Sequence, residues 1–259
     1  MSAFARTVVG VDGTDWGYEA LRQALVLAPV GDPIVRAITA LDTAPAIRAG
    51  FQAPHLAQLL EDEASHARDE AERIIGGKPG CSAHVVRGKP VDVLRRERDG
   101  LQATVLALGG RRSSRFLGIM LGDTGTELVH DAACSALLSC PSRGGEWRPR
   151  KIVVGLDSSN DARGALKVAD EVASVHGGEV EVISATGGKA IERGAEWSDR
   201  VQTWDRAHPV AALVDRSRHA DLVVVGSRGL HGVGSIGSVS ERLAHQAHCT
   251  ALIVHASLA

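Results

Sequence analysis

The sequence is poor in aromatic residues and in net charge. Aromatic residues make up 3% of the 259 positions, and the formal net charge is −2. Nucleic-acid binding normally relies on a positive surface or on rings that stack against bases, so this composition argues against a nucleic-acid partner. No apolar run reaches the roughly 20 residues of a membrane helix, and residues 1–7 lack the features of a signal peptide. We therefore expect a cytoplasmic protein with no membrane partner.

Cysteine is scarce as well. The four cysteines, Cys81, Cys134, Cys140 and Cys249, form no CxxC pair and no His/Cys cluster with zinc spacing. We expect reduced thiols, with Cys134 and Cys249 as small core residues, and no metal site built from them.

Short apolar strands alternate with helical patterns along the chain. Residues 7–12 (TVVGVD) form an apolar strand, and helical spacing of apolar residues follows over 16–27. The same alternation continues through a strand at 34–41 and a long helix at 54–75. Strands and helices in this order indicate an α/β fold with a parallel sheet that is covered on both faces. We expect two loops, one rich in Ala and Pro after residue 41 and one over 109–121.

The chain is a tandem duplication. Residues 151–169 (KIVVGLDSSNDARGALKVA) repeat residues 6–24 (RTVVGVDGTDWGYEALRQA). The repeats predict one domain over 1–142 and another over 149–259. The stretch between them, 141–149 (PSRGGEWRP), is rich in Pro and Gly and has the composition of an exposed linker.

The two repeats differ in length. Asp12 and Asp157 are 145 positions apart, but Pro90 and Pro209 are only 119 apart. The second repeat is therefore shorter between its first turn and its third helix, and we expect it to lack most of its second helix.

A glycine-rich stretch near the C-terminus carries the strongest functional signal. Four aliphatic residues (222–225) lead into a loop rich in Gly and Ser (226–237), and then into a helix and a second apolar strand. Glycines let the backbone approach a ligand closely, and a helix start attracts phosphate. Such loops are also common as plain connections, so the pattern alone is a weak indication of a nucleotide site.

Two motifs occur in order along the chain: VVGVDG or IVVGLDS at the first strand of each repeat, and strand-GSRG-loop-GSVSERLAH-helix at the fourth strand. Their combination resembles the universal stress protein family, in particular its tandem two-domain members. The resemblance covers nearly the whole chain. It implies two tandem doubly wound, Rossmann-like domains, each a five-stranded parallel sheet in the order 3-2-1-4-5, with nucleotide at the switch point between strands 1 and 4.

The resemblance also implies ATP, with magnesium, as the ligand of the second domain. The family motif G-x2-G-x9-G-[S/T]-x-[S/T] is matched here with seven rather than nine intervening residues. By this resemblance the acidic residue that ends the first strand accepts a hydrogen bond from the adenine amino group. The candidate nucleotide-binding residues are Gly155, Asp157, Ala185, Gly226, Ser227, Arg228, Gly229, Gly232, Gly237, Ser238, Val239 and Ser240.

The corresponding site of the first domain departs from the motif, and we expect it to bind nucleotide weakly or not at all. Its candidate residues are Gly10, Asp12, Gly109 and Gly122. Arg112 stands in place of the second motif glycine, and Asp123 replaces the residue that would contact phosphate. A carboxylate about 4 Å from a phosphate oxygen costs roughly 4 kcal/mol at an effective dielectric constant near 20.

Several alternatives remain open at this point. Asp12 and Asp157 are equally compatible with turns that cap the following helix. The protein is expected to be an ATP-binding regulatory protein of the stress response; the alternatives are a nucleotide-free dimerisation scaffold or a slow ATP-hydrolysing enzyme. No nucleophile lies beside an obvious base, so we expect no catalytic residue and at most a weak ATPase.

Assembly is inferred from the edges of the predicted sheets. The fifth strands, 135–139 and 250–254, would be exposed edges, and pairing them within one chain covers both. The poorly covered second domain suggests a homodimer.

Overall fold

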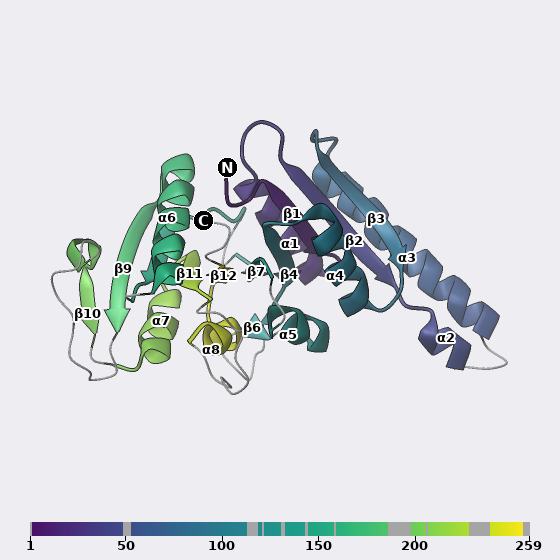
Figure 1. Ribbon diagram of the computed structural model, residues 1–259. Helices are drawn as coiled ribbons and strands as arrows, with labels where there is room; N and C mark the ends of the chain where they lie inside the picture. Colours follow the sequence, from purple (N-terminus) through teal and green to yellow (C-terminus); the bar gives the residue numbers. More distant parts are fainter. Residues whose placement is uncertain are drawn as a thin grey trace. The chain divides into compact units, whose positions relative to one another are not determined.

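The computed structural model describes residues 2–48, 53–112, 119–120, 122–130, 133–142, 145–157, 159–185, 198–205, 207–227 and 239–255. The chain divides into two compact units (Figure 1). Unit 1 comprises Met1–Gly109 and Gly122–Leu128, and unit 2 comprises Gly110–Leu121 and Val129–Ala259. This division differs from that of the sequence repeats, because the fifth strand of the first repeat lies in unit 2.

Unit 1 contains a parallel sheet in the order β3-β2-β1-β4. Its strands are β1 (Arg6–Gly10), β2 (Ile34–Leu41), β3 (Cys81–Arg87) and β4 (Val105–Gly109). Three helices cover them: α1 (Asp15–Leu27), α3 (Ala53–Ile75) and α4 (Pro90–Leu101). Helices α1 and α3 pack together on one face of this sheet, and α4 packs against β1 and β2 (Figure 1).

Two segments that were expected to be loops contain regular structure. Helix α2 (Ala44–Arg48) forms after β2, and in the turn before it Oδ1 of Asp42 accepts a hydrogen bond of 2.9 Å from the Ala44 N–H. Between β4 and helix α5 (Asp123–His130), the strands β5 (Arg111–Arg112) and β6 (Ile119–Met120) pair antiparallel. The loop predictions were wrong at these positions because short elements leave little periodicity in the sequence.

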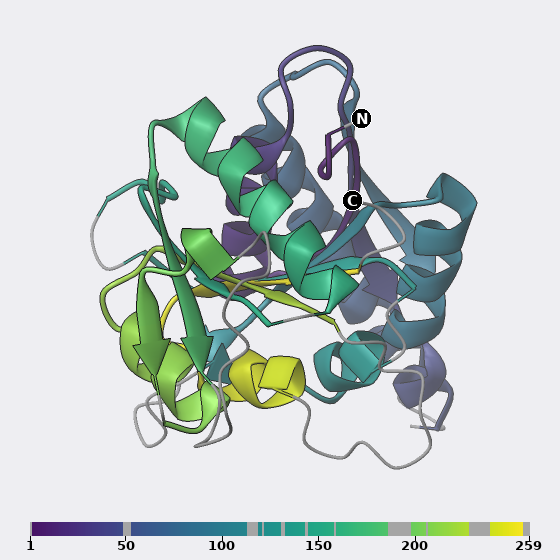
Figure 2. The same cartoon turned by 60° about the vertical axis from the view of Figure 1, so that its left-hand side comes forward.

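Unit 2 contains a parallel sheet in the order β10-β9-β8-β11-β12, which is the predicted order 3-2-1-4-5. Its strands are β8 (Lys151–Gly155), β9 (Glu179–Ala185), β10 (Thr203–Asp205), β11 (Leu222–Gly226) and β12 (Thr250–Val254). Helix α6 (Asn160–His176) covers one face, and α7 (Pro209–Ser217) and α8 (Val239–Gln246) cover the other (Figure 2). The prediction of an α/β fold with parallel sheets is confirmed.

The fifth strands of the two repeats pair with each other, as predicted. Strand β7 (Ser135–Ser139) runs antiparallel to β12 within unit 2, with Leu137 opposite Leu252. All residues of both strands are buried. This pairing closes one edge of the unit 2 sheet.

The second repeat has no room for a counterpart of α3. Among the described residues, the chain between β9 and β10 holds only a short 3-10 turn, Ser198–Arg200. The whole stretch 186–202 is shorter than the 23 residues of α3. A helix of the full length of α3 therefore does not fit in this stretch, in line with the expected shortening.

The linker between the repeats is not exposed throughout. Trp147 is only 6% exposed, and its indole Nε1–H donates a hydrogen bond of 3.2 Å to the carbonyl oxygen of Asp221. The expectation of an exposed linker was wrong at this residue, because the large apolar ring of tryptophan is stabilised by removal from water. Among the described residues, no helix has both the length and the apolar character of a membrane span.

Candidate functional site

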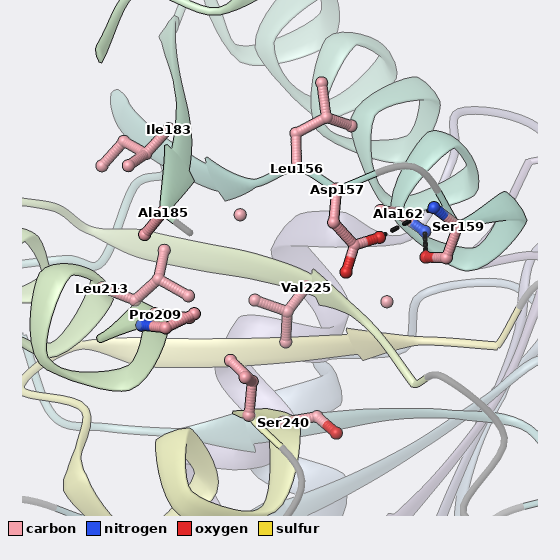
Figure 3. Close-up of a pocket in the computed structure, with 13 residues that line it drawn as sticks. Leu156, Asp157, Ser159, Ala162, Ile183, Ala185, Pro209, Leu213, Val225 and Ser240 are labelled. Atoms are coloured by element: carbon pink, nitrogen blue, oxygen red, sulfur yellow. Dashed lines mark hydrogen bonds between the residues drawn. The ribbon is translucent and has the colours of Figure 1, made fainter. Parts of the chain in front are cut away.

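The duplication builds a similar hollow in each unit, where the strands end. In unit 2 the chain leaves β8 toward β9 on one side, and β11 lies on the other side of β8. This reversal is the switch point at which open α/β sheets bind ligands. A cavity of about 120 Å³ lies there (Figure 3). Its described lining residues are Gly155, Leu156, Asp157, Ser159, Ala162, Ile183, Ala185, Pro209, Leu213, Val225, Gly226, Val239 and Ser240.

Asp157 lines the cavity and also takes part in the turn that starts α6. Its Oδ1 accepts a hydrogen bond of 2.8 Å from the Ser159 N–H, and the Ser159 hydroxyl in turn accepts one of 3.1 Å from the Ala162 N–H. These bonds form the turn and the cap that start α6. Asp157 also lines the cavity, and Figure 3 shows one carboxylate oxygen at Ser159 and the other directed away from it. The helix cap therefore holds the carboxylate in a fixed orientation at the cavity.

An apolar wall faces this carboxylate across the cavity. Ile183 and Ala185 come from the end of β9, and Pro209 and Leu213 come from α7 (Figure 3). The position of Pro209 at the start of α7 follows from its fixed φ and missing N–H, which suit the first helical turn. An apolar wall opposite a fixed acceptor suits a flat ring that carries a hydrogen-bond donor at its edge.

Gly155 keeps the floor of the cavity open. A Cβ at this position would lie 3.0 Å from Cδ1 of Leu213 and 3.1 Å from Cγ1 of Val225. In unit 1 the equivalent Gly10 faces Leu94 and Leu108 in the same way, at 3.2 and 3.0 Å. In both repeats, the glycine that ends the first strand therefore allows a close approach by a helix and a neighbouring strand. These are α4 and β4 in unit 1, and α7 and β11 in unit 2.

Gly226 and Ser227 both contact the first turn of α6. Gly226 lines the cavity, but a Cβ on it would lie 2.5 Å from the carbonyl carbon of Asp161, so this glycine permits β11 to contact α6. Ser227 is 2% exposed and is absent from the described lining of the cavity. Its hydroxyl donates to Oδ2 of Asp161 over 3.0 Å.

The other motif residues divide into two groups. Val239 and Ser240 open α8 and line the cavity, and Ser240 is 3% exposed. The candidates Arg228, Gly229, Gly232, Gly237 and Ser238 lie outside the described residues.

Sequence reasoning missed the apolar half of this lining. Leu156, Ile183, Leu213 and Val225 line the cavity but were not among the candidates. The signal that could have found them is the repeat itself. Leu213 and Leu94 follow Pro209 and Pro90 at the same spacing in the two repeats.

The cavity of unit 1 has a volume of about 670 Å³, and α3 supplies part of its wall. The four predicted residues Gly10, Asp12, Gly109 and Gly122 all line it. Oδ1 of Asp12 accepts hydrogen bonds from the hydroxyl (2.6 Å) and the N–H (3.2 Å) of Thr14, which caps α1.

The two departures from the motif take up structural roles in this part of the chain. Arg112 pairs with Ile119 in the β5–β6 ladder. Asp123 is exposed and begins α5, where its charge complements the positive end of the helix dipole. A carboxylate thus stands at the helix start where the motif would hold a phosphate. Within the described ranges, no group of three or more His, Cys, Asp or Glu side chains could hold a metal ion.

Comparisons with known proteins agree with this architecture. The model of the universal stress protein family matches residues 3–139 and 189–255. A universal stress protein of Mycolicibacterium smegmatis is 27% identical over 95% of this chain and 96% of its own length, and one of Mycobacterium tuberculosis is 25% identical over 79% and 80%. A universal stress protein structure from Archaeoglobus fulgidus superposes with a TM-score of 0.76 at 19% identity, over 97% of this chain and 98% of that one. The chain belongs to the universal stress protein family.

Proposed function

We propose that this chain is an ATP-binding regulatory protein of the stress response that holds the nucleotide in unit 2. The observation that carries the proposal is the cavity at the switch point, with the Asp157 carboxylate on one side and the Ile183, Ala185 and Leu213 wall on the other. Asp157 would accept a hydrogen bond from the exocyclic amino group of adenine, and the wall would cover the ring.

The start of α8 supports the same orientation. Val239 and Ser240 line the cavity at the N-terminal end of this helix, where free N–H groups and the helix dipole favour an anion. The phosphates would extend toward this end, and magnesium would be carried by the phosphates with protein carboxylates in a minor role.

Charge favours unit 2 over the larger cavity of unit 1. Asp157 is the only carboxylate among the described lining residues in unit 2, whereas Asp12, Asp42 and Glu63 line the cavity of unit 1. Repulsion from each added carboxylate costs about 1 kcal/mol at 4 Å in bulk water and more away from water. Binding of ATP in unit 1 is therefore expected to be weak or absent.

Calorimetric titration of nucleotide-stripped protein with ATP and magnesium tests this proposal. Wild type is expected to bind one ATP per chain, and Asp157→Asn should weaken binding about 10-fold to 100-fold, as expected when a hydrogen bond to a charged group is lost. Asparagine keeps an oxygen for the Ser159 N–H, so the α6 cap is retained. Asp12→Asn is the matched control in unit 1 and should leave the affinity unchanged.

Two results would contradict the proposal. Two equivalent sites per chain would mean that the carboxylates of unit 1 do not exclude ATP. No binding to wild type would favour the nucleotide-free scaffold.

We also propose that two copies of the chain associate through unit 2. Strand β10 ends the sheet order of this unit and is half-buried along its length. An edge strand of this kind can pair with a second copy. Light scattering at working concentration is expected to give the mass of a dimer, and a monomer mass would contradict the association.

A further inference from the structure

The pairing of β7 with β12 is symmetric with respect to the duplication. Ser135 and Thr250 each begin their strand, and Cys140 and His255 each follow the end of theirs. The Cys140 N–H donates a hydrogen bond of 3.1 Å to the Thr250 hydroxyl, and the His255 N–H donates one of 3.2 Å to the Ser135 hydroxyl. The same contact thus occurs in both repeats, and the antiparallel register continues past both ends of the ladder.

This register places Cys140 opposite Cys249. The ladder pairs Leu138 with Ala251, and it advances by one residue in each strand, so Cys140 comes to the level of Cys249. The Cys140 thiol lies 3.8 Å from the carbonyl oxygen of His248, and this carbonyl group is bonded to the nitrogen of Cys249. The Cys140 sulfur therefore lies against the peptide group that precedes Cys249.

The spacing of opposite residues matches that of a disulfide. Opposite Cα atoms in an antiparallel pair are about 4.5 to 5.5 Å apart. Disulfides join residues whose Cα atoms are about 4.4 to 6.8 Å apart. All four cysteines are thiols in the structure, and Cys140 and Cys249 are 2% and 7% exposed. A disulfide adds no atoms to the two side chains, so the product takes no more space than the two buried thiols.

The other two cysteines lie in different surroundings. Cys81 belongs to β3 in unit 1. Cys134 precedes β7 as Cys249 precedes β12, and the register places it opposite His255. The duplication therefore provides two equivalent pairs of positions, and one of these pairs consists of two cysteines.

We propose that Cys140 and Cys249 form a reversible disulfide that joins the fifth strands of the two repeats when hydrogen peroxide oxidises them. The Cys249 thiolate attacks one peroxide oxygen, which gives a sulfenic acid, and the hydroxide that leaves takes up a proton to form water. The Cys140 sulfur then attacks the sulfenic sulfur, the S–S bond forms, and a second water leaves. Two thiols and one hydrogen peroxide thus give one disulfide and two waters, and a dithiol reductant reverses the oxidation.

This bond would fix β7 of the first repeat to the sheet that the second repeat builds. It closes a long loop in the unfolded chain, so the oxidised protein should be more stable than the reduced one. Hydrogen peroxide is close to water in size, so it can reach a thiol that is closed to a larger alkylating reagent. The inference is independent of the nucleotide site.

Peroxide oxidation in a Cys81→Ser background, which removes the most exposed thiol, tests the proposal. After removal of the peroxide, the protein is unfolded in urea, alkylated with iodoacetamide and digested. Two of the three remaining thiols should be protected from alkylation, and peptide mapping without reductant should find Cys140 joined to Cys249. Dithiothreitol should restore both thiols. The urea midpoint of the oxidised protein should be higher than that of the reduced protein.

Cys134→Ser in the same background is the matched control, because Cys134 is 3% exposed in the same unit but is not opposite a cysteine. It should form the disulfide as its parent does, whereas Cys140→Ser and Cys249→Ser should not. His255→Cys completes the equivalent pair, so this variant should form a second disulfide between Cys134 and position 255.

Three results would overturn the proposal. The first is that all three thiols of the Cys81→Ser protein remain alkylatable after peroxide treatment. The second is a disulfide that includes Cys134 in this protein. The third is an equal loss of thiols in Cys134→Ser and Cys140→Ser, because that loss would show oxidation of single thiols without pairing.

Discussion

Ser227, the second residue of the glycine motif, donates a hydrogen bond of 3.0 Å from its hydroxyl to Oδ2 of Asp161 in the first turn of α6. The serine is 2% exposed, and the bond joins residues that are 66 positions apart. Ser227, which was expected to contact nucleotide, thus connects the end of β11 to α6 through this hydrogen bond.

Replacement of Ser227 by alanine should reduce stability and spare ATP binding. The variant loses a hydrogen bond to a charged acceptor, so the free energy of unfolding in urea is expected to fall by about 1.5 to 3 kcal/mol. The affinity for ATP should match that of wild type when both are measured well below the unfolding transition. Ser65→Ala, at an exposed position in α3, is the control and should not destabilise. If Ser227→Ala kept full stability but bound ATP more weakly, the Ser227 hydroxyl would contact the nucleotide and this prediction would be contradicted.

Alanine at Gly226 should be destabilising for a steric reason. Its Cβ would lie 2.5 Å from the carbonyl carbon of Asp161 and 2.6 Å from the nitrogen of Ala162, and both are backbone atoms that cannot rotate away. Overpacking of this kind costs about 1 to 3 kcal/mol. Chemical unfolding measures the loss.

Gly100→Ala provides the control for this prediction. Gly100 lies in α4, and a Cβ there meets nothing within 4 Å. Alanine should therefore stabilise by about 0.5 to 1 kcal/mol. If both alanine variants were equally stable, the close approach of β11 and α6 would not explain why position 226 requires glycine.

The larger elements could be predicted because their signals extend over many residues. Helix α3 shows its apolar spacing over several turns, and the repeat relates Asp157 to Asp12 and β8 to β1. The strand order followed from the family resemblance together with the alternation of strands and helices. Short elements such as α2 are accompanied by single local contacts, here the turn bond from the Ala44 N–H to Asp42, that the sequence pattern does not indicate.

The roles of individual site residues were harder to predict. The sequence indicates that Ser227 and Gly226 follow a buried strand, but the partner of each is a backbone or side-chain atom of α6, which is distant in sequence. The same holds for the apolar wall, where Leu213 meets Gly155 only after the sheet has formed. Such long-range contacts arise from packing and leave no local pattern.

Trp147 should contribute measurably to the stability of unit 2. Its indole N–H binds the carbonyl of Asp221, and Oδ2 of the same aspartate accepts hydrogen bonds from the N–H groups of Arg150 (3.1 Å) and Lys151 (2.8 Å). Trp147→Phe removes the indole hydrogen bond and part of the buried ring, and should lower the free energy of unfolding by at least about 1 kcal/mol. Arg148→Gln, which changes an exposed ion pair with Glu146, should change it by less than about 0.5 kcal/mol. Equal effects of the two substitutions on the free energy of unfolding would mean that the contacts of Trp147 do not stabilise unit 2.

Cys81 should be the only thiol that iodoacetamide alkylates in the folded protein, and it should react slowly. Cys134, Cys140 and Cys249 are 3%, 2% and 7% exposed, whereas Cys81 is half-buried. Burial raises the pKa of the Cys81 thiol, although the Val35 backbone N–H and the charge of Lys78 act in the opposite direction. Because only the thiolate is alkylated, a raised pKa means less reactive species at any given pH.

Alkylation by iodoacetamide, followed by mass spectrometry, checks this prediction. One adduct per chain is expected under native conditions, none in Cys81→Ser, and four in wild type unfolded in urea. The rate at pH 8 should be lower than for free cysteine, and it should still increase at a pH where the rate for free cysteine has levelled off. A rate that levels off at or below the pH for free cysteine would show that Lys78 and the Val35 N–H outweigh burial at this thiol.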